Sequence, residues 1–193
     1  YWSGPLHDSV VNYGFTKKAQ VVQGLCYRRQ FGFDSIHLLM TNLYGPGDHF
    51  HPSVSHVIPA LIKKCVEAKE NGDSSVSVWG TGTASRDYLY VVDAAQAIVL
   101  AAQMRNSAEP LNLGNNREVT IRETVETIAR IVGFTGTLEW DSSKPDGQPR
   151  RRVDASRAER ELGRHASTKF EEGLRNTVEW YLANRELAEK APR

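Results

Sequence analysis

Apolar side chains at spacings of three and four predict a helix over residues 13–29. Phe15, Ala19, Val22 and Cys26 would lie on one face of this helix, and such spacing is typical of an amphipathic helix that packs on a core. The pattern therefore predicts that Cys26, like Cys65 further along, is a reduced thiol in or near the core. No strand precedes this helix in the pattern, although a helix that covers a doubly wound sheet normally follows one.

Helices and strands alternate over the rest of the chain. The apolar run SIHLLM at residues 35–40 predicts a buried strand. Thr120 is followed by Glu123 in the pattern of a capping box, which predicts a helix start. Further helices are expected over residues 57–68, 93–102, 156–162 and 170–187, and further strands over residues 76–79, 88–92, 111–113 and 137–140. This alternation indicates the α/β class.

Composition narrows the class of protein. The 193 residues are 40% hydrophobic and 24% charged, which is close to the globular average. Lys and Arg number 24 against 23 for Asp and Glu, and a net charge of +1 argues against a nucleic-acid binder. No apolar run reaches the roughly 18–20 residues of a transmembrane helix, and the first residues do not resemble a signal peptide. A soluble, cytoplasmic protein is expected, with no nucleic-acid or membrane partner.

Tyr13 and Lys17 are four residues apart, so a helix would place them on the same face. An ammonium beside a phenol favours the phenolate and lowers the pKa of the tyrosine. Such a tyrosine can act as a general acid or base on a hydroxyl or carbonyl group. Surface Tyr and Lys at this spacing are also common without a function, so the pair alone leaves both interpretations open.

Trp79 and Arg86 flank the turn-like segment GTGTAS at residues 80–85. A dinucleotide-binding loop would need a third glycine opening a helix, but Ser85 stands there and a strand follows. A tryptophan and an arginine across a turn can instead stack on a base and bind a phosphate. The alternative is a hydrophobic strand end beside a surface arginine.

Histidines cluster at His49, His51 and His56, with Asp48 as the nearby carboxylate. The segment is rich in Pro and Gly and offers no fixed set of further ligands, so no metal site is expected. His56 begins a predicted helix, where its charge can be tuned and its ring can face a cleft. The run KPDGQPRRR at residues 144–152 is a turn followed by basic residues, which is either a solvated loop or a loop that faces an anion.

Six strings, taken in order, resemble the GDP-L-fucose synthase family of extended short-chain dehydrogenases/reductases. They are Tyr13-x-x-x-Lys17, TNLYGPGDHFHP at residues 41–52, SHVIPAL at 55–61, VWGTG at 78–82, RDYLYV at 86–91 and KPDG at 144–147. The resemblance implies an enzyme that uses NADP(H) to epimerise and reduce a GDP-4-keto-6-deoxy sugar. It also implies a homodimer for the complete enzyme.

The resemblance implies roles for individual residues. Tyr13 would protonate the C4 oxygen of the sugar, and Lys17 would lower its pKa and bind the nicotinamide ribose. Asn42 and Leu43 would border the nicotinamide, and His56 would contact the cofactor and act as acid and base in the epimerisation. The remaining residues would hold the GDP-sugar: Lys64, where the family often has Arg, Trp79, Arg86 and Asp146.

The resemblance also implies a division of the chain. Residues 1–72 would be the C-terminal part of a Rossmann-type dinucleotide-binding domain with a doubly wound sheet. Residues 73–185 would be mainly a smaller α/β substrate-binding domain, with the strand at 111–113 returning to the sheet, and residues 186–193 would fray.

Three parts of the family pattern are absent from this sequence: the Gly-rich cofactor loop, the catalytic serine and the epimerisation cysteine, which lie upstream of the tyrosine helix. The chain alone is therefore expected to be an inactive C-terminal portion. Two alternatives stay open. One is another nucleotide-sugar epimerase, dehydratase or reductase of the same superfamily, and the other is a non-catalytic module that binds a nucleotide at Trp79 and Arg86.

Overall fold

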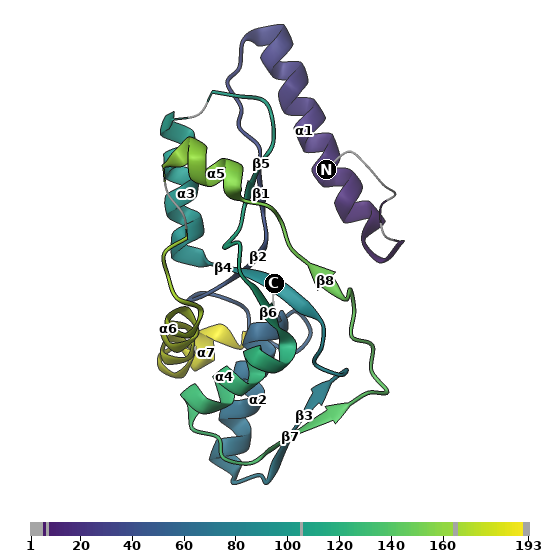
Figure 1. The fold of residues 1–193 in the computed structure, drawn as a ribbon, viewed down its shortest axis with the longest axis vertical. Helices are drawn as coiled ribbons and strands as arrows, with labels where there is room; N and C mark the ends of the chain where they lie inside the picture. Colours follow the sequence, from purple (N-terminus) through teal and green to yellow (C-terminus); the bar gives the residue numbers. More distant parts are fainter. Residues whose placement is uncertain (1–5, 7, 105, 164–165, 191–193) are drawn as a thin grey trace.

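The molecule is elongated, with two groups of helices along its long axis (Figure 1). The computed structural model describes residues 6, 8–104, 106–163 and 166–190. The upper group in Figure 1 contains α1 (Val11–Phe31), α3 (Val91–Met104) and α5 (Ser156–Leu162). The lower group contains α2 (Val57–Asn71), α4 (Ile121–Val132), α6 (Phe170–Ala183) and α7 (Arg185–Ala188), while the short 3-10 helix η1 (Asp8–Val10) precedes α1.

The strands of the described residues form three small sheets, and most of the strand pairs are parallel. In the upper part, β1 (Leu38–Met40) is parallel to β5 (Leu111–Leu113). In the middle, β4 (Ser85–Tyr90) is parallel to β2 (Asn42–Tyr44) and β8 (Arg150–Arg151) and antiparallel to β6 (Glu118–Thr120). In the lower part, β3 (Ser75–Trp79) is parallel to β7 (Thr137–Asp141). Parallel strands with interspersed helices confirm the predicted α/β class.

The extended segment that begins with β1 changes its partner at Thr41. The Thr41 amide donates to the carbonyl of Leu113 at 3.0 Å, next to β5. One residue later, Asn42 is in register with Tyr88 of β4. The same stretch of backbone therefore connects the upper and the middle sheets, and it continues four residues beyond the predicted end at residue 40.

The expected orientation of α1 is wrong. Phe15 is 67% and Val22 47% exposed, and Cys26 is exposed as well, whereas Val21 is buried. Gly24 explains the orientation, because a Cβ at this position would overlap the ring of His37, the residue directly before β1. A bare glycine lets α1 approach closely on that side, so the predicted apolar face points outward. The prediction of a core thiol holds for Cys65, which is buried.

Local end signals define the helices that the sequence predicted best. The Thr120 hydroxyl accepts a hydrogen bond from the Glu123 amide at 3.0 Å, which confirms the predicted cap of α4. Helices α2 and α4 end at Gly72 and Gly133, both in the left-handed region that glycine adopts without strain. Among the described residues, no helix is long and apolar enough to cross a membrane.

The C-terminal segment is anchored in the hydrophobic core between the helices of the lower group, which we call the lower core. The predicted helix at residues 170–187 is interrupted at Asn184, and α7 follows. Ala188 is buried, and its carbonyl accepts a hydrogen bond from the Phe50 amide at 2.9 Å. The Phe50 ring also stacks on Tyr181, with 4.3 Å between ring centroids. Residues 186–190, for which the sequence predicts fraying, are thus held against the loop before His56, while residues 191–193 lie outside the described chain.

Candidate functional site

The structure brings four of the predicted site residues to the turn between β3 and β4. Trp79 ends β3 and Arg86 is the second residue of β4, so the two lie at opposite ends of this turn. Lys64 reaches it from α2, because its Nζ lies 5.7 Å from the centre of the Trp79 ring. Asp146 reaches it from the loop after β7. Residues from four separate segments therefore share one small surface.

Trp79 supplies a flat apolar surface with positive charge beside it. Its side chain is 63% exposed although tryptophan is usually largely buried. Besides Lys64, the ammonium of Lys144 lies 5.8 Å from the ring centre. The sequence placed Lys144 only in a basic loop, and the structure shows that it belongs to this group. An exposed indole with two neighbouring cations suits a planar base that carries phosphates.

Asp146 holds the turn itself. Its Oδ1 accepts a hydrogen bond from the Thr81 amide at 2.7 Å, and its Oδ2 accepts one from the Thr81 hydroxyl at 2.8 Å. These hydrogen bonds, the backbone one first, lower the pKa of Asp146. Both carboxylate oxygens are therefore engaged with Thr81, a residue that sequence reasoning did not single out.

Arg86 is held by the backbone of the same loop. Its Nη1 donates to the carbonyl oxygens of Ser85 and Gln148, both at 2.7 Å. Its other terminal nitrogen lies near Gly147. A guanidinium fixed through one nitrogen keeps further N–H groups for an anion.

Basic side chains continue along β8, next to Arg86. Arg150 pairs with Glu118 of β6, with Nε and Nη2 each 2.8 Å from a carboxylate oxygen. The hydrogen bonds from Arg150 lower the pKa of Glu118 to about 2. An open hollow of about 280 Å³ lies between Arg150, Arg152, Val153 and Asp154. The structure thus places the basic run beside the turn, with Arg151 in register with Arg86.

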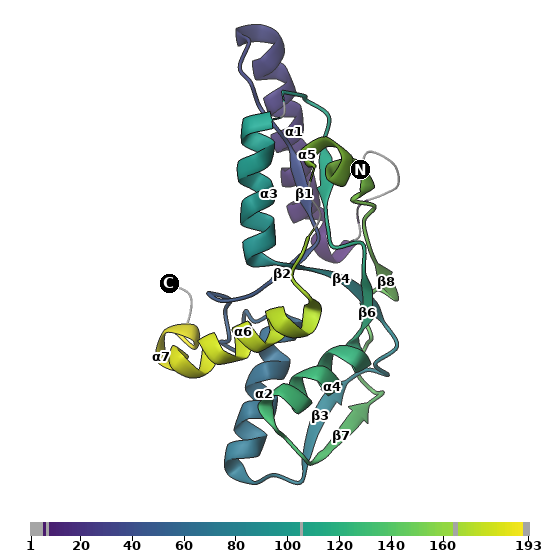
Figure 2. The same cartoon turned by 60° about the vertical axis from the view of Figure 1, so that its left-hand side comes forward.

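Tyr13 and Lys17 lie on one exposed face of α1. The Lys17 Nζ is 5.5 Å from the centre of the Tyr13 ring, and the Tyr13 side chain is 65% exposed. In Figures 1 and 2, the N-terminal end of α1 that carries them is at the level where β1 passes into β2. Within the described part of the chain, no carboxylate pairs with Lys17.

Asn42 and Leu43 form the start of β2. The Asn42 amide nitrogen donates to the backbone carbonyl of Asp87 at 3.4 Å, and Leu43 is 38% exposed. The Asp87 carboxylate is fully buried and accepts a hydrogen bond from the Asn115 amide at 3.0 Å. Burial raises the pKa of this carboxyl group. Asp87 therefore ties β4, and with it β2, to the segment after β5.

His56 precedes α2, and its side chain is 83% exposed. Its Nδ1 lies 3.9 Å from Oδ1 of Asp48, whose side chain is only 14% exposed. Burial raises the pKa of Asp48. Sequence reasoning weighed Asp48 only as a metal ligand, yet the structure makes it the partner of the candidate acid/base histidine. Among the described residues, no three or more His, Cys, Asp or Glu side chains form a group that could hold a metal ion.

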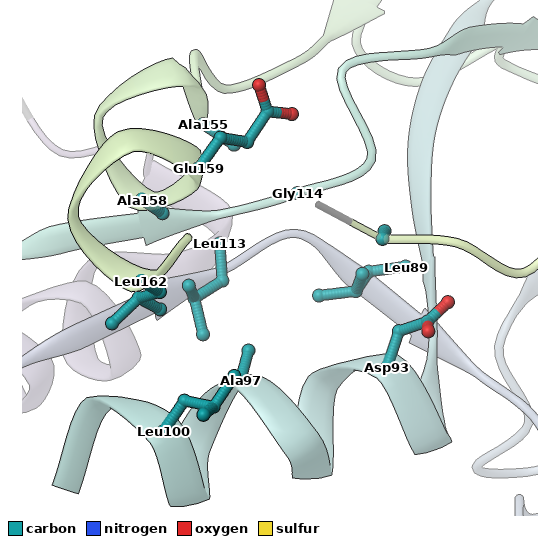
Figure 3. A pocket seen from close by; sticks show the side chains of 11 residues that line it. Leu89, Asp93, Ala97, Leu100, Leu113, Gly114, Ala155, Ala158, Glu159 and Leu162 are labelled. Carbon is teal, nitrogen blue, oxygen red and sulfur yellow. The ribbon is translucent and has the colours of Figure 1, made fainter. Parts of the chain in front are cut away.

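A small, partly open pocket lies elsewhere, between α3, α5 and β5 (Figure 3). Its lining is mostly aliphatic, with Asp93 and Glu159 as acidic members. Its volume of about 30 Å³ accommodates a water molecule. The Asp93 carboxylate accepts the Thr168 amide at 3.0 Å. None of the candidate site residues lines this pocket, so it is separate from the candidate site.

Comparisons with known proteins place the chain among nucleotide-sugar enzymes in sequence and in fold. The chain is 44% identical over 182 residues to the Probable GDP-L-fucose synthase 1 of Oryza sativa subsp. japonica, covering 94% of this chain and 55% of the relative. It is 38% identical over 192 residues to the GDP-L-fucose synthase of Escherichia coli (strain K12), covering 95% of this chain and 60% of the relative. The chain thus spans a little over half the length of these relatives.

A solved structure has the same fold over nearly the whole chain. It is a GDP-L-fucose synthetase from Naegleria fowleri bound to NADP, with 33% identity and a TM-score of 0.88, and the match covers 97% of this chain and 60% of that one. The family model for NAD dependent epimerases/dehydratases matches residues 2–114. This protein is therefore a member of the NAD dependent epimerase/dehydratase family.

Proposed function

We propose that this chain carries the sugar-nucleotide-binding part of an NADP-dependent enzyme that epimerises and reduces a GDP-4-keto-6-deoxy sugar. The observation that carries the proposal is the turn between Trp79 and Arg86, where an exposed indole, two ammonium groups and a guanidinium converge. The relatives named as GDP-L-fucose synthases support the substrate class.

The turn would bind the base and the diphosphate of the nucleotide through different contacts. The guanine would stack on the exposed Trp79 ring, an interaction worth about 1–3 kcal/mol per base. Lys64, Lys144 and Arg86 would bind the diphosphate, and Arg86 can donate two parallel hydrogen bonds to it. Asp146 would act here by holding Thr81, since both of its oxygens are already engaged.

The residues on α1 and β2 fit a nicotinamide dinucleotide. Lys17 offers an ammonium without a carboxylate partner among the described residues, so it can bind ribose hydroxyls. Asn42 and Leu43 present an amide and an apolar side chain at the exposed start of β2. When bound, NADPH supplies the hydride that reduces the keto group. The NADP-bound Naegleria fowleri neighbour supports this cofactor.

Two residues would move protons on the sugar. The Tyr13 hydroxyl would donate its proton to the C4 oxygen, and the nearby Lys17 ammonium would attract the phenolate that remains. His56 would remove and return a proton at a carbon beside the keto group, with Asp48 orienting its ring. For this chain alone we expect binding without turnover, because its sequence contains no Gly-rich cofactor loop.

Isothermal titration calorimetry on the purified chain tests the binding part of the proposal. GDP and GDP-fucose should bind, and Trp79→Ala or Arg86→Ala should each weaken binding by about tenfold or more. Arg130→Ala is the matched control, because this exposed arginine of α4 pairs with Glu171 of α6 and contacts none of the candidate site residues. Tighter binding of UDP-galactose than of GDP-fucose would contradict the substrate class. Reduction of the keto sugar by the chain alone at an ordinary enzyme rate would contradict the expected lack of turnover.

We also infer a homodimer formed through the outward face of α1. Phe15 and Val22, seven residues apart on this helix, are large apolar side chains with 67% and 47% of their surface exposed, and helices bury such a stripe against a partner. Light scattering after gel filtration should give twice the 21.6 kDa mass. Val22→Glu should shift it toward the monomer, while Val99→Glu on the exposed side of α3 should not. A monomeric wild-type chain contradicts this inference.

A cytoplasmic location completes the proposal. Cys26 and Cys65 are both free thiols, a state typical of a reducing compartment. Fractionation of cells that produce the protein tests this, and recovery outside the cytoplasm contradicts it.

A further inference from the structure

The turn between Trp79 and Arg86 is held by α4 as well as by Asp146. The Ile121 amide donates to the Ala84 carbonyl at 2.9 Å, and the Arg122 amide donates to the Gly82 carbonyl at 3.0 Å. These are N–H groups of the first turn of a helix, which have no partner inside the helix itself. The backbone of the turn thus caps α4, and the position of the turn depends on the start of this helix.

The Arg122 side chain adds a second contact to the same turn. Its Nη2 donates to the Thr81 carbonyl at 3.1 Å, and its guanidinium lies 4.3 Å from the centre of the Trp140 ring. Trp140 belongs to β7 and also packs on Gly82, where a Cβ would come within 2.5 Å of the ring. Arg122 therefore connects the turn to β7 through one guanidinium.

Thr81 lies at the centre of these contacts. Its amide and hydroxyl donate to Asp146, and its carbonyl accepts from Arg122. The amide, the hydroxyl and the carbonyl of the residue between the stacking tryptophan and the anion-binding arginine are thus all engaged. Arg122 and Asp146 bind Thr81 through different atoms, so the loss of either one leaves the other in place.

We propose that Arg122 is a positioning residue for nucleotide binding. It does not touch the ligand, but it fixes the turn so that Trp79 and Arg86 are already placed when the nucleotide arrives. Ordering a loop during binding weakens affinity, and a preformed loop avoids that loss. This inference rests on the proposed function, since it assigns a role in the same nucleotide site.

The experiment compares Arg122→Ala and Arg122→Lys with Arg130→Ala, an exposed arginine on the same helix that contacts Glu171. Calorimetry with GDP should show binding weakened by about tenfold for Arg122→Ala. Arg122→Lys should recover part of the loss, because an ammonium can still lie over Trp140 and donate once to Thr81. Arg130→Ala should bind like the wild type, and the melting temperatures should show that every variant is folded.

Two further measurements separate positioning from general stability. Hydrogen–deuterium exchange without ligand should become faster for the peptide covering residues 79–86 in Arg122→Ala, but not in Arg130→Ala. The double variant Trp140→Leu/Arg122→Ala should lose less GDP-binding free energy than the two single variants lose together, because both substitutions remove the same contact between Arg122 and Trp140.

The outcomes distinguish this inference from the proposed function. If the wild-type chain binds GDP and Arg122→Ala binds it with the same affinity, the positioning role is overturned and the proposed function stays intact. A wild-type chain that does not bind GDP overturns the proposed function, and the exchange experiment then decides about Arg122. Faster exchange at residues 79–86 supports its hold on the turn, and unchanged exchange overturns it.

Discussion

Nδ1 of His56 lies 3.9 Å from Oδ1 of Asp48, so a largely buried carboxylate faces an exposed imidazole. The His49 amide fixes the same carboxylate oxygen at 2.8 Å. Phe50, which follows in the chain, is anchored on Tyr181 and on the Ala188 carbonyl. The C-terminal helix thus supports the loop that orients the candidate acid/base residue.

Asp48→Asn should slow proton exchange on the sugar in an active enzyme that contains this chain. The neutral amide no longer offers the His56 ring a carboxylate to orient it, and we expect a loss of about tenfold or more. Deuterium uptake from solvent into the GDP-sugar, followed by mass spectrometry, measures it. GDP affinity should stay unchanged, and an unaltered exchange rate would show that Asp48 does not orient His56.

Stability should fall as the pH drops below about 6.5 because of His37. Burial lowers the pKa of this imidazole, and the nearby Arg28 lowers it further. The folded state therefore disfavours the protonated His37 ring. The contribution of His37 to the free energy of unfolding is complete above the pKa of the unfolded chain and is lost as the pH falls toward the lower pKa of the folded state. Thermal melts between pH 8 and 5 should show a weaker dependence in His37→Gln. The exposed His49→Gln should retain the wild-type dependence, and identical slopes in both variants would contradict the assignment.

Glu118 should contribute to stability in a lower pH range. Hydrogen bonds from Arg150 lower its pKa from 4.5 to about 2. The contribution is present above pH 4.5 and is lost as the pH falls from there toward about 2. Glu118→Gln should flatten the acid-unfolding curve in this range, measured by circular dichroism, whereas the exposed Glu139→Gln should not. A curve that Glu118→Gln leaves unchanged would mean that the ion pair is broken in solution.

Phe50→Ala should destabilise the fold by about 3–5 kcal/mol, the usual effect of removing a buried aromatic ring. The Phe50 side chain is fully buried and stacks on Tyr181. Urea unfolding measures the free energy, and the same substitution at Phe33, which is 60% exposed, is the control and should cost far less. Equal losses at the two positions would contradict the packing of Phe50 in the lower core.

Gly82→Ala should weaken GDP binding more than Gly47→Ala. Both glycines have positive φ, near +80° and +88°, so an alanine is strained at either position by about 1–3 kcal/mol. Only at Gly82 would the new Cβ also meet a neighbour, the Trp140 ring at 2.5 Å, whereas nothing lies within 4 Å at Gly47. Calorimetry with GDP compares the two variants, and equal affinities would exclude a role for this close approach.

The sequence predicted the elements whose signals are local. Thr120 with Glu123 located the start of α4, and the strand predicted at residues 111–113 coincides with β5. By contrast, β6 and β8 were not predicted, because each has only two or three residues and exists through its pairing with β4. The outward side of α1 was also mispredicted, since its closest approach to the core depends on Gly24 and His37 rather than on an apolar stripe.

The candidate site was predictable in its residue types but not in its connections. Trp79 and Arg86 stand out in the sequence because an indole and a guanidinium flank a glycine-rich turn. The contacts of Thr81 with Asp146 and Arg122 join positions 65 and 41 residues apart, and spacing alone does not reveal such contacts. The candidate roles of Lys144 and Asp48 likewise depend on contacts that only the fold creates, with Trp79 and with His56.

The two-stranded sheet of β1 and β5 has a consequence for handling the protein. Each strand pairs only with the other among the described residues, so both outer edges present free backbone N–H and C=O groups. Open edges invite strand addition from other chains, and Phe31 and Phe33, which precede β1 in the sequence, are 64% and 60% exposed. The isolated chain should therefore self-associate while it is still folded, and the extent of this association should depend on protein concentration and on salt.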